Sequence, residues 1–576
     1  GRRRDVMLRS GAGIRVALLA IVGVALVAGA LTRAASARQS ATFDEIILVS
    51  GGARGVTLGR WDMVTDQPPL MMWLYGWAVS SADPVLPTED RSWGFDERWD
   101  YARAVFFEGA NDPEVLLPRA RLVTTVMAAG LVFAAGLFGL WVAGPVSGVL
   151  AALFTALVPD VLAHGGVAYN DVPLALAFLL SVWALDATVR RPSLRSGALT
   201  GVALACAFGM KMSALALLPI AGVLLGMEAT SRWGEEAWRR RVVASAGAGM
   251  AAAYLTLVVF YGGDVTLSLL RFNFWRTVLH TTGGHPAPAF LLGSVSEGGW
   301  WYYFPVAFFL KTPVGLHIAL VTAVTLLASS AVTALRTHRE AALAQVMAWR
   351  GRAPLVGALV FGAFLMRSDL NAGFRYALPA VSLLAVFTAI GASRAWRTRG
   401  GAAGDSSADA LGDSPRGMST GRGRSAVRVV VVVAVILSAL SVLRTHPWHL
   451  SYASAWVGGP TAAWRALSDS NVDWGQGLLE LRRFMQDEGV ASVRLSYFGS
   501  ARPSAYGIEY VALPSFFRLT RDRTSGSEAD PRFTVISATN LQGLYLQGRD
   551  PFASYREREP YRILGHALFV YDDTAR

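Results

Sequence analysis

Residues 121–143 read RLVTTVMAAGLVFAAGLFGLWVA, and residues 146–163 follow as VSGVLAALFTALVPDVLA. Each run has roughly the 20 predominantly apolar residues that a helix needs to cross the hydrocarbon core of a bilayer. Similar runs lie near 14–33, 172–189, 242–261, 301–335, 354–366, 374–393 and 427–444, with two short ones within 196–227. The sequence therefore predicts a polytopic α-helical membrane protein with about eleven transmembrane helices.

The composition of the 576-residue chain supports this prediction. Hydrophobic residues make up 53% of the chain and charged residues 16%, whereas soluble proteins carry about 25% charged residues. A soluble cytoplasmic enzyme, a disordered chain and a fibrous protein are therefore excluded. The net charge of +12 is typical of arginine at the cytoplasmic face of a membrane protein, so we expect membrane lipids and no nucleic acid as partners. Cys206 is the only cysteine, so no intrachain disulfide can form.

Arginine clusters predict the sidedness of the chain. They lie at 2–9, 190–195, 239–241, 336–350 and 394–428. All of them fall on one side if the N-terminus is cytoplasmic, and parity then places the C-terminus outside. We expect a multi-pass protein of the bacterial inner (plasma) membrane. The first run has an apolar core too long for a cleaved signal peptide, so we interpret it as an uncleaved anchor.

The sequence divides into a transmembrane module, residues 1–444, and an outer α/β domain, residues 445–576. The first outer loop, residues 35–118, carries 13 acidic and 6 basic residues. Residues 394–426 are rich in Gly, Ser, Asp and Arg, which is typical of a disordered cytoplasmic linker. In the outer domain, Phe533-Thr-Val-Ile-Ser and Ala567-Leu-Phe-Val-Tyr are typical of short strands.

Two carboxylates lie close to the end of the first span, in Thr42-Phe43-Asp44-Glu45. An acid at the outer membrane surface can accept a proton from a substrate hydroxyl, so Asp44 is a candidate general base. The same four residues fit a capping box, in which Thr42 and Glu45 open a helix. The two interpretations are compatible, because Glu45 can cap while Asp44 reacts.

Lysine occurs at only two positions, and both lie in apolar surroundings. Lys311 lies about ten residues into the run that begins at Trp301, roughly 15 Å from its end. An unpaired ammonium at that depth costs about 2.5–3.5 kcal/mol, which favours a functional role over snorkelling. Pro313 is expected to kink the same helix. Lys211, between two short helices, is a second candidate, with interface anchoring as the alternative.

Asp171 and Arg375 each begin a predicted span from the outer side. Asp171, in Tyr169-Asn-Asp-Val-Pro173, is explained either by a place in the site or by capping of its helix. The guanidinium fork of Arg375 suits a phosphate, although interface anchoring explains it equally. His280 and His285 give only a weak metal signal, so we expect no metal site.

Several short motifs occur in a fixed order over residues 40 to 570. They are Asp44-Glu45, Pro68-Pro-Leu70, Tyr169-Asn-Asp-Val-Pro173, Gly209-Met-Lys-Met-Ser213, Gly299-Trp-Trp-Tyr-Tyr-Phe-Pro305 with Leu310-Lys-Thr-Pro313, Gly373-Phe-Arg-Tyr-Ala-Leu-Pro379 and Ser468-Asp-Ser-Asn-Val-Asp-Trp-Gly-Gln476. In this order the chain resembles bacterial glycosyltransferase family 39 proteins. These are relatives of the protein O-mannosyltransferases and of the aminoarabinose transferase that acts on lipid A.

The resemblance implies a GT-C fold and a sugar donor linked to polyprenyl phosphate. It assigns the base of the first outer loop to Asp44, with Glu45 beside it, and implies that Asp171 lines the site. Basic residues at the membrane boundary then hold the donor phosphate. The role of the Ser468–Gln476 motif does not follow from the resemblance.

The chain departs from the mannosyltransferase pattern. In that family the acidic pair is followed closely by His, and a His-Pro-Pro-Leu motif is often followed by Lys. Here the corresponding residues are Ile47, Gln67 and Met72. The phosphate contacts are therefore expected from Lys211, Lys311, Arg375 or Arg60.

The expected function is that of an integral membrane glycosyltransferase. It would move a monosaccharide from a polyprenyl-phosphate carrier to a hydroxyl of a lipid, glycan or protein on the outer side. Lipid phosphate is the leaving group, so no cofactor is expected. The alternatives are a transporter or flippase of lipid-linked sugars, which would be expected to show inverted repeats, and a membrane scaffold, which leaves Lys311 unexplained.

Overall fold

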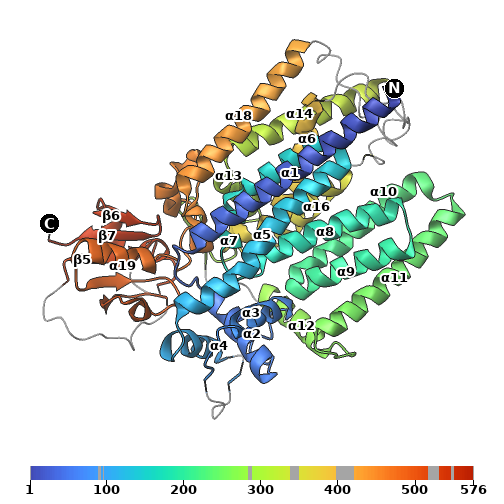
Figure 1. Ribbon diagram of the computed structural model, residues 1–576. Coiled ribbons are helices and arrows are strands. Elements are labelled where there is room, and N and C mark those ends of the chain that lie inside the picture. The colour runs from blue at the N-terminus through green and yellow to red at the C-terminus, as the bar shows by residue number, and fades with distance from the viewer. Residues whose placement is uncertain are drawn as a thin grey trace.

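The computed structural model describes residues 2–87, 93–94, 96–282, 288–337, 349, 351–396, 421–516, 531–546 and 550–574. In this part of the chain a bundle of long helices carries a smaller domain of helices and strands at one end (Figure 1). The second half of the first outer loop contributes to the same end of the bundle. Most of the predicted linker, residues 397–420, lies outside the described residues.

Eight helices among the described residues are long and apolar enough to cross a membrane, some of them together with adjoining 3₁₀ turns. They are α1 (Arg2–Ser36), α5 (Pro113–Ala143), α8 (Asp171–Arg190), α10 (Leu217–Arg232), α11 (Glu236–Phe260), α14 (Val314–Thr337), α17 (Leu378–Ala392) and α18 (Gly421–Thr445). The predicted polytopic helical architecture is confirmed.

Three further apolar segments complete the predicted set of runs. Helices α6 (Pro145–Ala156) and α7 (Pro159–Gly165) form a pair bent by 64°, which is a ninth candidate span. The bend lies at Pro159, because proline lacks the N–H that would continue the helical ladder. Helices α9 (Leu194–Met210) and α16 (Arg352–Leu365) are apolar but shorter. The eight long helices, the bent pair and the two short helices together make up the eleven segments expected from the sequence.

The predicted run at 301–335 is two helices. Helix α13 (Tyr303–Lys311) ends immediately before Thr312 and Pro313, and the candidate span in α14 begins at Val314. Pro313 thus ends one helix instead of kinking a continuous one. Lys311 is thus the last residue of α13 and not an interior residue of one long span.

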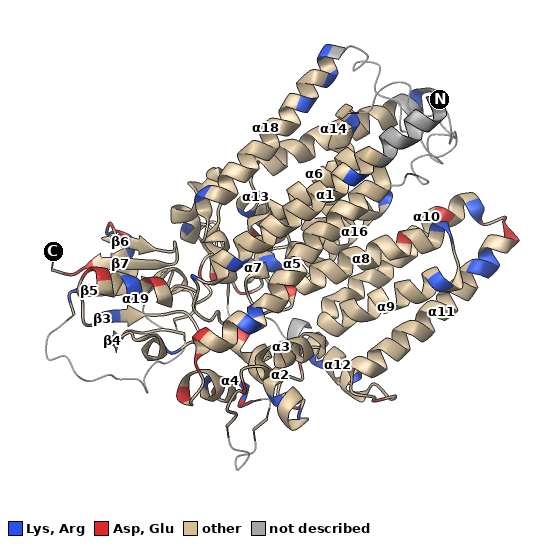
Figure 2. Ribbon diagram, viewed as in Figure 1, with Lys and Arg blue, Asp and Glu red and all other residues tan. Residues whose placement is uncertain are grey.

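The ends of the bundle differ in charge. The N-terminus, the connection between α10 and α11 and the start of α18 lie at the end away from the C-terminal domain (Figure 1). Figure 2 shows Lys and Arg at the start of α18 and, together with acidic residues, at the connection between α10 and α11. The structure thus brings to one end the described arginine clusters that the sequence assigns to one side.

Short helices of the first outer loop lie at the opposite end of the bundle. They are α2 (Glu45–Leu58), α3 (Leu70–Ser80), α4 (Arg98–Arg103) and a π-helical turn at Ala104–Glu108, with α12 (Ser268–Thr282) nearby (Figure 1). Helices α2 and α3 cross closely at Gly52 and Gly76. A Cβ on Gly52 would lie 2.2 Å from the carbonyl oxygen of Met72, so only glycine permits this crossing.

The C-terminal domain is built on a five-stranded sheet of order β4-β3-β5-β7-β6. The strands are β3 (Val493–Ser496), β4 (Tyr510–Ala512), β5 (Phe533–Ser537), β6 (Arg562–Leu564) and β7 (Leu568–Asp572). Strand β3 pairs in parallel with β4 and β5, whereas β7 pairs antiparallel with β5 and β6. The two predicted strands are β5 and β7. Phe484 of α19 (Leu478–Asp487) packs on Phe533 with ring centroids 5.3 Å apart.

The remaining regular elements are small. Strands β1 (Ala289–Leu291) and β2 (Ser294–Ser296) form an antiparallel hairpin between α12 and α13. Helices α20 (Ala538–Leu541) and α21 (Ala553–Arg556) are single turns in the C-terminal domain.

Candidate functional site

A cavity of about 890 Å³ lies where the helical bundle meets the C-terminal domain. Its residues come from the segment 35–118, from the ends of several apolar helices and from the C-terminal domain. Among the sequence-predicted site residues, Asp44, Asp171, Lys211 and Arg375 line it. The structure therefore brings together four residues that lie as far as 331 positions apart in the chain.

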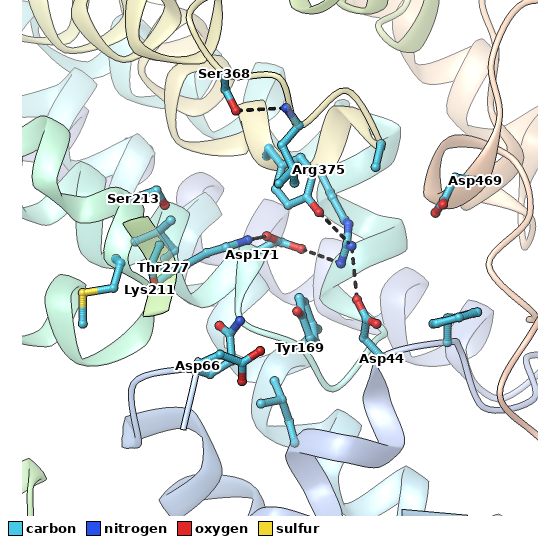
Figure 3. Close-up of a pocket in the computed structure, with 18 of the residues that line it drawn as sticks. Asp44, Asp66, Tyr169, Asp171, Lys211, Ser213, Thr277, Ser368, Arg375 and Asp469 are labelled. Carbon is cyan, nitrogen blue, oxygen red and sulfur yellow. Dashed lines mark hydrogen bonds and ion pairs between the residues drawn. The ribbon is translucent and has the colours of Figure 1, made fainter. Parts of the chain in front are cut away.

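These four side chains form one ionic cluster (Figure 3). Arg375 donates from Nη2 to Asp44 Oδ2 at 3.2 Å and from Nη1 to Asp171 Oδ2 at 3.3 Å. Lys211 Nζ donates to Asp171 Oδ1 at 2.5 Å. The cluster holds two carboxylates and two cations, so its formal charge is zero.

Each member of the cluster lies at or beside a helix end. Asp44 precedes α2, Asp171 is the first residue of α8, and Lys211 follows α9 in an extended conformation. Arg375 lies in the 3₁₀ turn Phe374–Ala377 that precedes α17. Asp171 is the first residue of its helix and Asn170 the N-cap, so the capping alternative does not account for the Asp171 side chain.

Aromatic rings surround the cations. The Arg375 guanidinium lies 4.0 Å from the ring centroid of Trp474, 4.9 Å from that of Tyr376 and 5.0 Å from that of Tyr169. The Lys211 ammonium lies 4.5 Å from the Tyr376 ring. Rings at these distances attract a desolvated cation through their quadrupole. They also remove water and flexibility from the guanidinium fork.

Asp44 is the most accessible member of the cluster. Its side chain is 23% exposed, against 5% for Arg375 and 2% for Asp171. A carboxylate that reaches the cavity and is held by a single guanidinium nitrogen can meet a substrate hydroxyl. Asp171, which binds both cations, is placed to orient them.

Glu45 does not line the cavity. Its carboxylate is fully buried and accepts hydrogen bonds from Arg121 Nε at 2.8 Å and Nη2 at 2.7 Å. It also accepts from the backbone N–H of Thr42 at 2.8 Å and of Ala168 at 2.7 Å. Burial opposes ionisation, but these partners outweigh it and the pKa of Glu45 lies below its ordinary value. The predicted capping box is not formed, because α2 begins at Glu45 itself with Asp44 as N-cap and no side-chain capping bond. Glu45 instead fastens the start of α2 to α5 through Arg121.

Lys311 and Arg60 lie elsewhere. The Lys311 ammonium is buried, donates to the carbonyl oxygens of Leu450 at 2.8 Å and Asn471 at 2.7 Å, and lies 3.5 Å from Asp160 Oδ2. Arg60 is exposed beyond the end of α2. Neither lines the cavity, so the structure does not bring these two predicted phosphate ligands to it. The helix break at Pro313 explains Lys311, because it turns the ammonium toward internal carbonyls.

The Ser468–Gln476 motif has a structural role that the sequence did not reveal. Asn471 accepts from the Phe374 N–H at 2.8 Å through Oδ1 and donates to the Tyr303 hydroxyl at 2.9 Å. The carbonyl oxygen of Trp474 accepts from the Phe43 N–H at 2.9 Å. The motif therefore holds the residues beside Arg375 and Asp44 at the same time, and places Trp474 beneath the guanidinium.

Other cavity residues also escaped the sequence analysis. Tyr376 and Trp474 lie within two of the motifs that carry the family resemblance. Their place in those motifs was the sequence signal that could have identified them as cavity residues. Arg98 and Arg367 are additional cations of the lining, and nothing in their local sequence marks them. Within the described ranges, no three His, Cys, Asp or Glu side chains approach closely enough to hold a metal ion.

Loss of Lys311 is expected to affect the fold rather than donor use. Lys311→Met leaves Asp160 buried without its cation, and breaking a buried pair costs about 3–5 kcal/mol. The melting temperature of the purified protein should fall while the donor KM of the folded fraction stays unchanged. Lys311→Met combined with Asp160→Leu should recover stability, because both charges are then removed. An unchanged melting temperature with a raised donor KM would contradict this expectation.

Asp473 of the motif makes stability depend on pH. Burial raises the pKa of Asp473 to about 7, from an ordinary value of 3.8. A carboxyl whose pKa is raised on folding binds a proton more tightly in the folded state, so its contribution to stability is lost as pH rises from about 4 to 7. The melting temperature of the wild type should therefore fall over this range.

Asp473→Asn should flatten that decline by several degrees, since the amide stays neutral at every pH. Asp487→Asn, an exposed aspartate at the end of α19, should keep the wild-type slope. Melting curves in detergent at pH 5, 6, 7 and 8 measure both. Equal slopes for Asp473→Asn and the wild type would show that Asp473 does not titrate in this way.

Comparisons with solved structures give distant similarities. The chain is similar to ArnT from Cupriavidus metallidurans bound to undecaprenyl phosphate, with 13% identity, a TM-score of 0.43, and coverage of 96% of this chain and 97% of that one. It is also similar to the archaeal oligosaccharyltransferase AglB from Archaeoglobus fulgidus in complex with an inhibitory peptide and a dolichol-phosphate. There the identity is 11%, the TM-score 0.45, and the coverage 73% of this chain and 56% of that chain.

A third similar structure is the S. cerevisiae protein O-mannosyltransferase Pmt1-Pmt2 complex bound to the sugar donor. The identity is 14%, the TM-score 0.34, and the coverage 49% of this chain and 40% of that chain. No curated protein sequence matches the chain.

A family model matches residues 63–278, and its description is Dolichyl-phosphate-mannose-protein mannosyltransferase. The matched segment contains Asp171 and Lys211 of the cluster, and the resemblance that the motifs indicate is confirmed there. Over residues 63–278 the chain is therefore similar to the family of that description.

Proposed function

We propose that the protein transfers a monosaccharide from a polyprenyl phosphate to an acceptor hydroxyl at the outer face of the membrane. The observation that carries this proposal is the cluster of Asp44, Arg375, Asp171 and Lys211 in a large cavity at the outer ends of the membrane helices. It combines a reachable carboxylate with two oriented cations. Acceptor activation and phosphate binding need these two kinds of group.

The apolar side of the cavity supports a lipid donor. Leu174 of α8, Met212 and Leu215 of the turn before α10, and Phe361 and Leu365 of α16 line it. All five come from or adjoin membrane-spanning or apolar helices. A polyprenyl chain can therefore lie against these side chains while its phosphate reaches the charged cluster.

Arg375 and Lys211 are the proposed phosphate ligands. A guanidinium fork and an ammonium both form short, charge-assisted bonds to phosphate oxygens. Asp171 binds both cations and keeps their donors directed to one place. The Nε of Arg375 is buried and has no hydrogen-bond partner among the described residues, so one donor of the fork remains for a ligand.

The donor phosphate competes with Asp44 for Arg375. In the structure the pair is formed, with 3.2 Å between Arg375 Nη2 and Asp44 Oδ2. A phosphate that takes the place of Asp44 frees the carboxylate to act as a base. Activation of the acceptor would thus follow donor binding.

In the proposed reaction Asp44 takes the proton of the acceptor hydroxyl while the hydroxyl oxygen bonds to the anomeric carbon. The bond between that carbon and the phosphate oxygen breaks, and its electron pair stays on the lipid phosphate. Arg375 and Lys211 stabilise the charge that develops there. The activated donor already contains its leaving group, so the step is balanced without a nucleotide.

We infer that the protein lies in a bacterial plasma membrane with the cavity on the outer side. The basic residues at the connection between α10 and α11 and at the start of α18 lie away from the C-terminal domain (Figure 2), and basic residues gather at the cytoplasmic face. The N-terminus is then cytoplasmic and residues 445–576 are extracytoplasmic.

Asp44→Asn should lower transfer by about 10²- to 10⁴-fold, the usual contribution of general base catalysis. Affinity for undecaprenyl phosphate should be retained or increased, because the amide competes less well for Arg375. Asp100→Asn is the matched control: it changes a first-loop carboxylate whose side chain is 74% exposed and should leave transfer unchanged. The assay is transfer from undecaprenyl-phosphate-linked sugars, with lipid binding measured on the same preparation.

Near wild-type turnover by Asp44→Asn would reject the base assignment. A wild-type protein that moves lipid-linked sugar across vesicles without transferring it would instead identify a flippase. Loss of affinity in parallel with turnover would show that Asp44 contributes to donor binding and does not compete with it.

The inferred topology predicts opposite labelling of two single cysteines. In a Cys206→Ala background, Ser504→Cys in the C-terminal domain should react with an impermeant thiol reagent in intact spheroplasts. Ala237→Cys, in the first turn of α11, should react only after the membrane is permeabilised. Both positions are exposed. The reverse pattern would invert the topology.

A further inference from the structure

The cavity extends beyond Asp44 to an aromatic wall. We use this name for Phe43 and Trp99 of the first outer loop and Phe498, Phe516 and Tyr545 of the C-terminal domain, all of which line the cavity. Phe43 stacks on Phe498 with ring centroids 5.3 Å apart, and Phe498 stacks on Tyr545 at 5.5 Å. Trp99 meets Phe43 edge-on at 5.2 Å. Two segments of the chain thus share one aromatic surface.

The aromatic wall is fixed to the proposed base. Phe43 immediately precedes Asp44, its N–H donates to Trp474 O at 2.9 Å, and its carbonyl oxygen accepts from Ser500 Oγ at 2.7 Å. The C-terminal domain therefore holds both backbone polar groups of Phe43, the residue before Asp44. A molecule that binds the wall is brought close to the Asp44 carboxylate.

Polar groups accompany the rings. Asp469 lines the cavity, and its Oδ2 accepts from the Tyr545 hydroxyl at 3.0 Å. Asp469 also has a φ of +53°, a left-handed conformation that few side chains adopt without support. The local structure thus maintains a carboxylate at the aromatic end of the cavity.

We propose that the aromatic wall with Asp469 is the acceptor subsite, and that the acceptor presents a pyranose ring to it. The proposal rests on the proposed glycosyltransferase function. The aliphatic side of the cavity is assigned to the donor lipid, so the aromatic side remains for the acceptor. A pyranose has a face of C–H bonds that packs on aromatic rings and hydroxyls that donate to carboxylates.

The carboxylates suit a hydroxyl-rich acceptor. The cluster cations Lys211 and Arg375 are bound to Asp171 and are assigned to the donor phosphate. Asp44 and Asp469 can accept hydrogen bonds from the hydroxyls of a sugar. In the transfer step, one ring hydroxyl gives its proton to Asp44 and bonds to the anomeric carbon, while the lipid phosphate leaves with the electron pair.

Phe516 allows a test that spares the fold, because its side chain is 45% exposed. Phe516→Leu removes the ring, and Phe516→Trp restores an aromatic face. Tyr561→Leu is the control, since Tyr561 belongs to the same domain, is 48% exposed and does not line the cavity. Asp469→Asn tests the carboxylate.

The full-length protein in nanodiscs is given undecaprenyl-phosphate-linked sugars with methyl glucopyranoside or methyl galactopyranoside as acceptor. Transfer to the pyranoside and hydrolysis of the donor by water are measured separately. Phe516→Leu and Asp469→Asn should raise the acceptor KM by about tenfold or less, as expected for loss of one aromatic or hydrogen-bonding contact. Donor hydrolysis should stay within about twofold of the wild type, because no donor contact changes. Phe516→Trp and Tyr561→Leu should behave like the wild type.

Saturation-transfer NMR with the same pyranosides gives a readout that needs no donor. The wild type should bind methyl glucopyranoside or methyl galactopyranoside, and Phe516→Leu should weaken that signal. Sorbitol, which has the hydroxyls but no ring face, should give none. Pyranoside binding can be measured even if no lipid-linked sugar proves to be a donor. The experiment therefore distinguishes failure of the proposed function from failure of the proposed acceptor subsite.

Two outcomes would overturn the inference. The first is an absence of pyranoside binding by the wild type, or an acceptor KM that neither Phe516→Leu nor Asp469→Asn changes. The second is transfer to a serine- and threonine-containing peptide, with that KM raised by the same variants while pyranosides are inert. The latter would assign the aromatic wall to a protein acceptor.

Discussion

The structure around the cavity depends on the burial of one guanidinium, that of Arg375. A buried charge is stable only when it is paired and hydrogen-bonded. Arg375 meets this requirement with Asp44 of the first loop, Asp171 of α8 and the Trp474 ring of the C-terminal domain. Three parts of the chain must therefore come together around one side chain. Removal of any one of them leaves the guanidinium without part of its surroundings.

Other buried ion pairs hold this arrangement in place without entering the cavity. Glu45 and Arg121 join α2 to α5, and Lys311 with Asp160 joins α13 to α7. Residue type does not separate these pairs from the members of the cavity cluster. Position separates them: the members of the cluster line the cavity, whereas Glu45 and Lys311 do not. The role of a charged residue in a membrane protein thus depends on whether its neighbours leave its side chain facing a cavity.

Much of the architecture followed from the sequence because apolar runs and their breaks are local signals. Asp171 and Arg375 were recognisable because each marks the outer end of an apolar helix within a short motif. Lys311 was expected at the donor phosphate because its internal partners, the carbonyl oxygens of Leu450 and Asn471 and the Asp160 carboxylate, are far from it in sequence. Trp474 and Tyr545 were missed as cavity residues because their contacts with Arg375 and Asp469 are distant in sequence and leave no periodic pattern. The cellular side of the cavity and the roles of its residues stay predictions.

The Asp44–Arg375 pair has a consequence for the end of each catalytic cycle. On the proposed mechanism Asp44 is protonated when the new glycosidic bond has formed, and the lipid phosphate still occupies the guanidinium. Loss of that proton to the outer aqueous phase recreates an internal counter-ion, 3.2 Å from Arg375 in the structure, which competes with the spent carrier. Deprotonation of Asp44 and release of the spent lipid phosphate are then coupled. The enzyme thereby releases a product that would otherwise inhibit it.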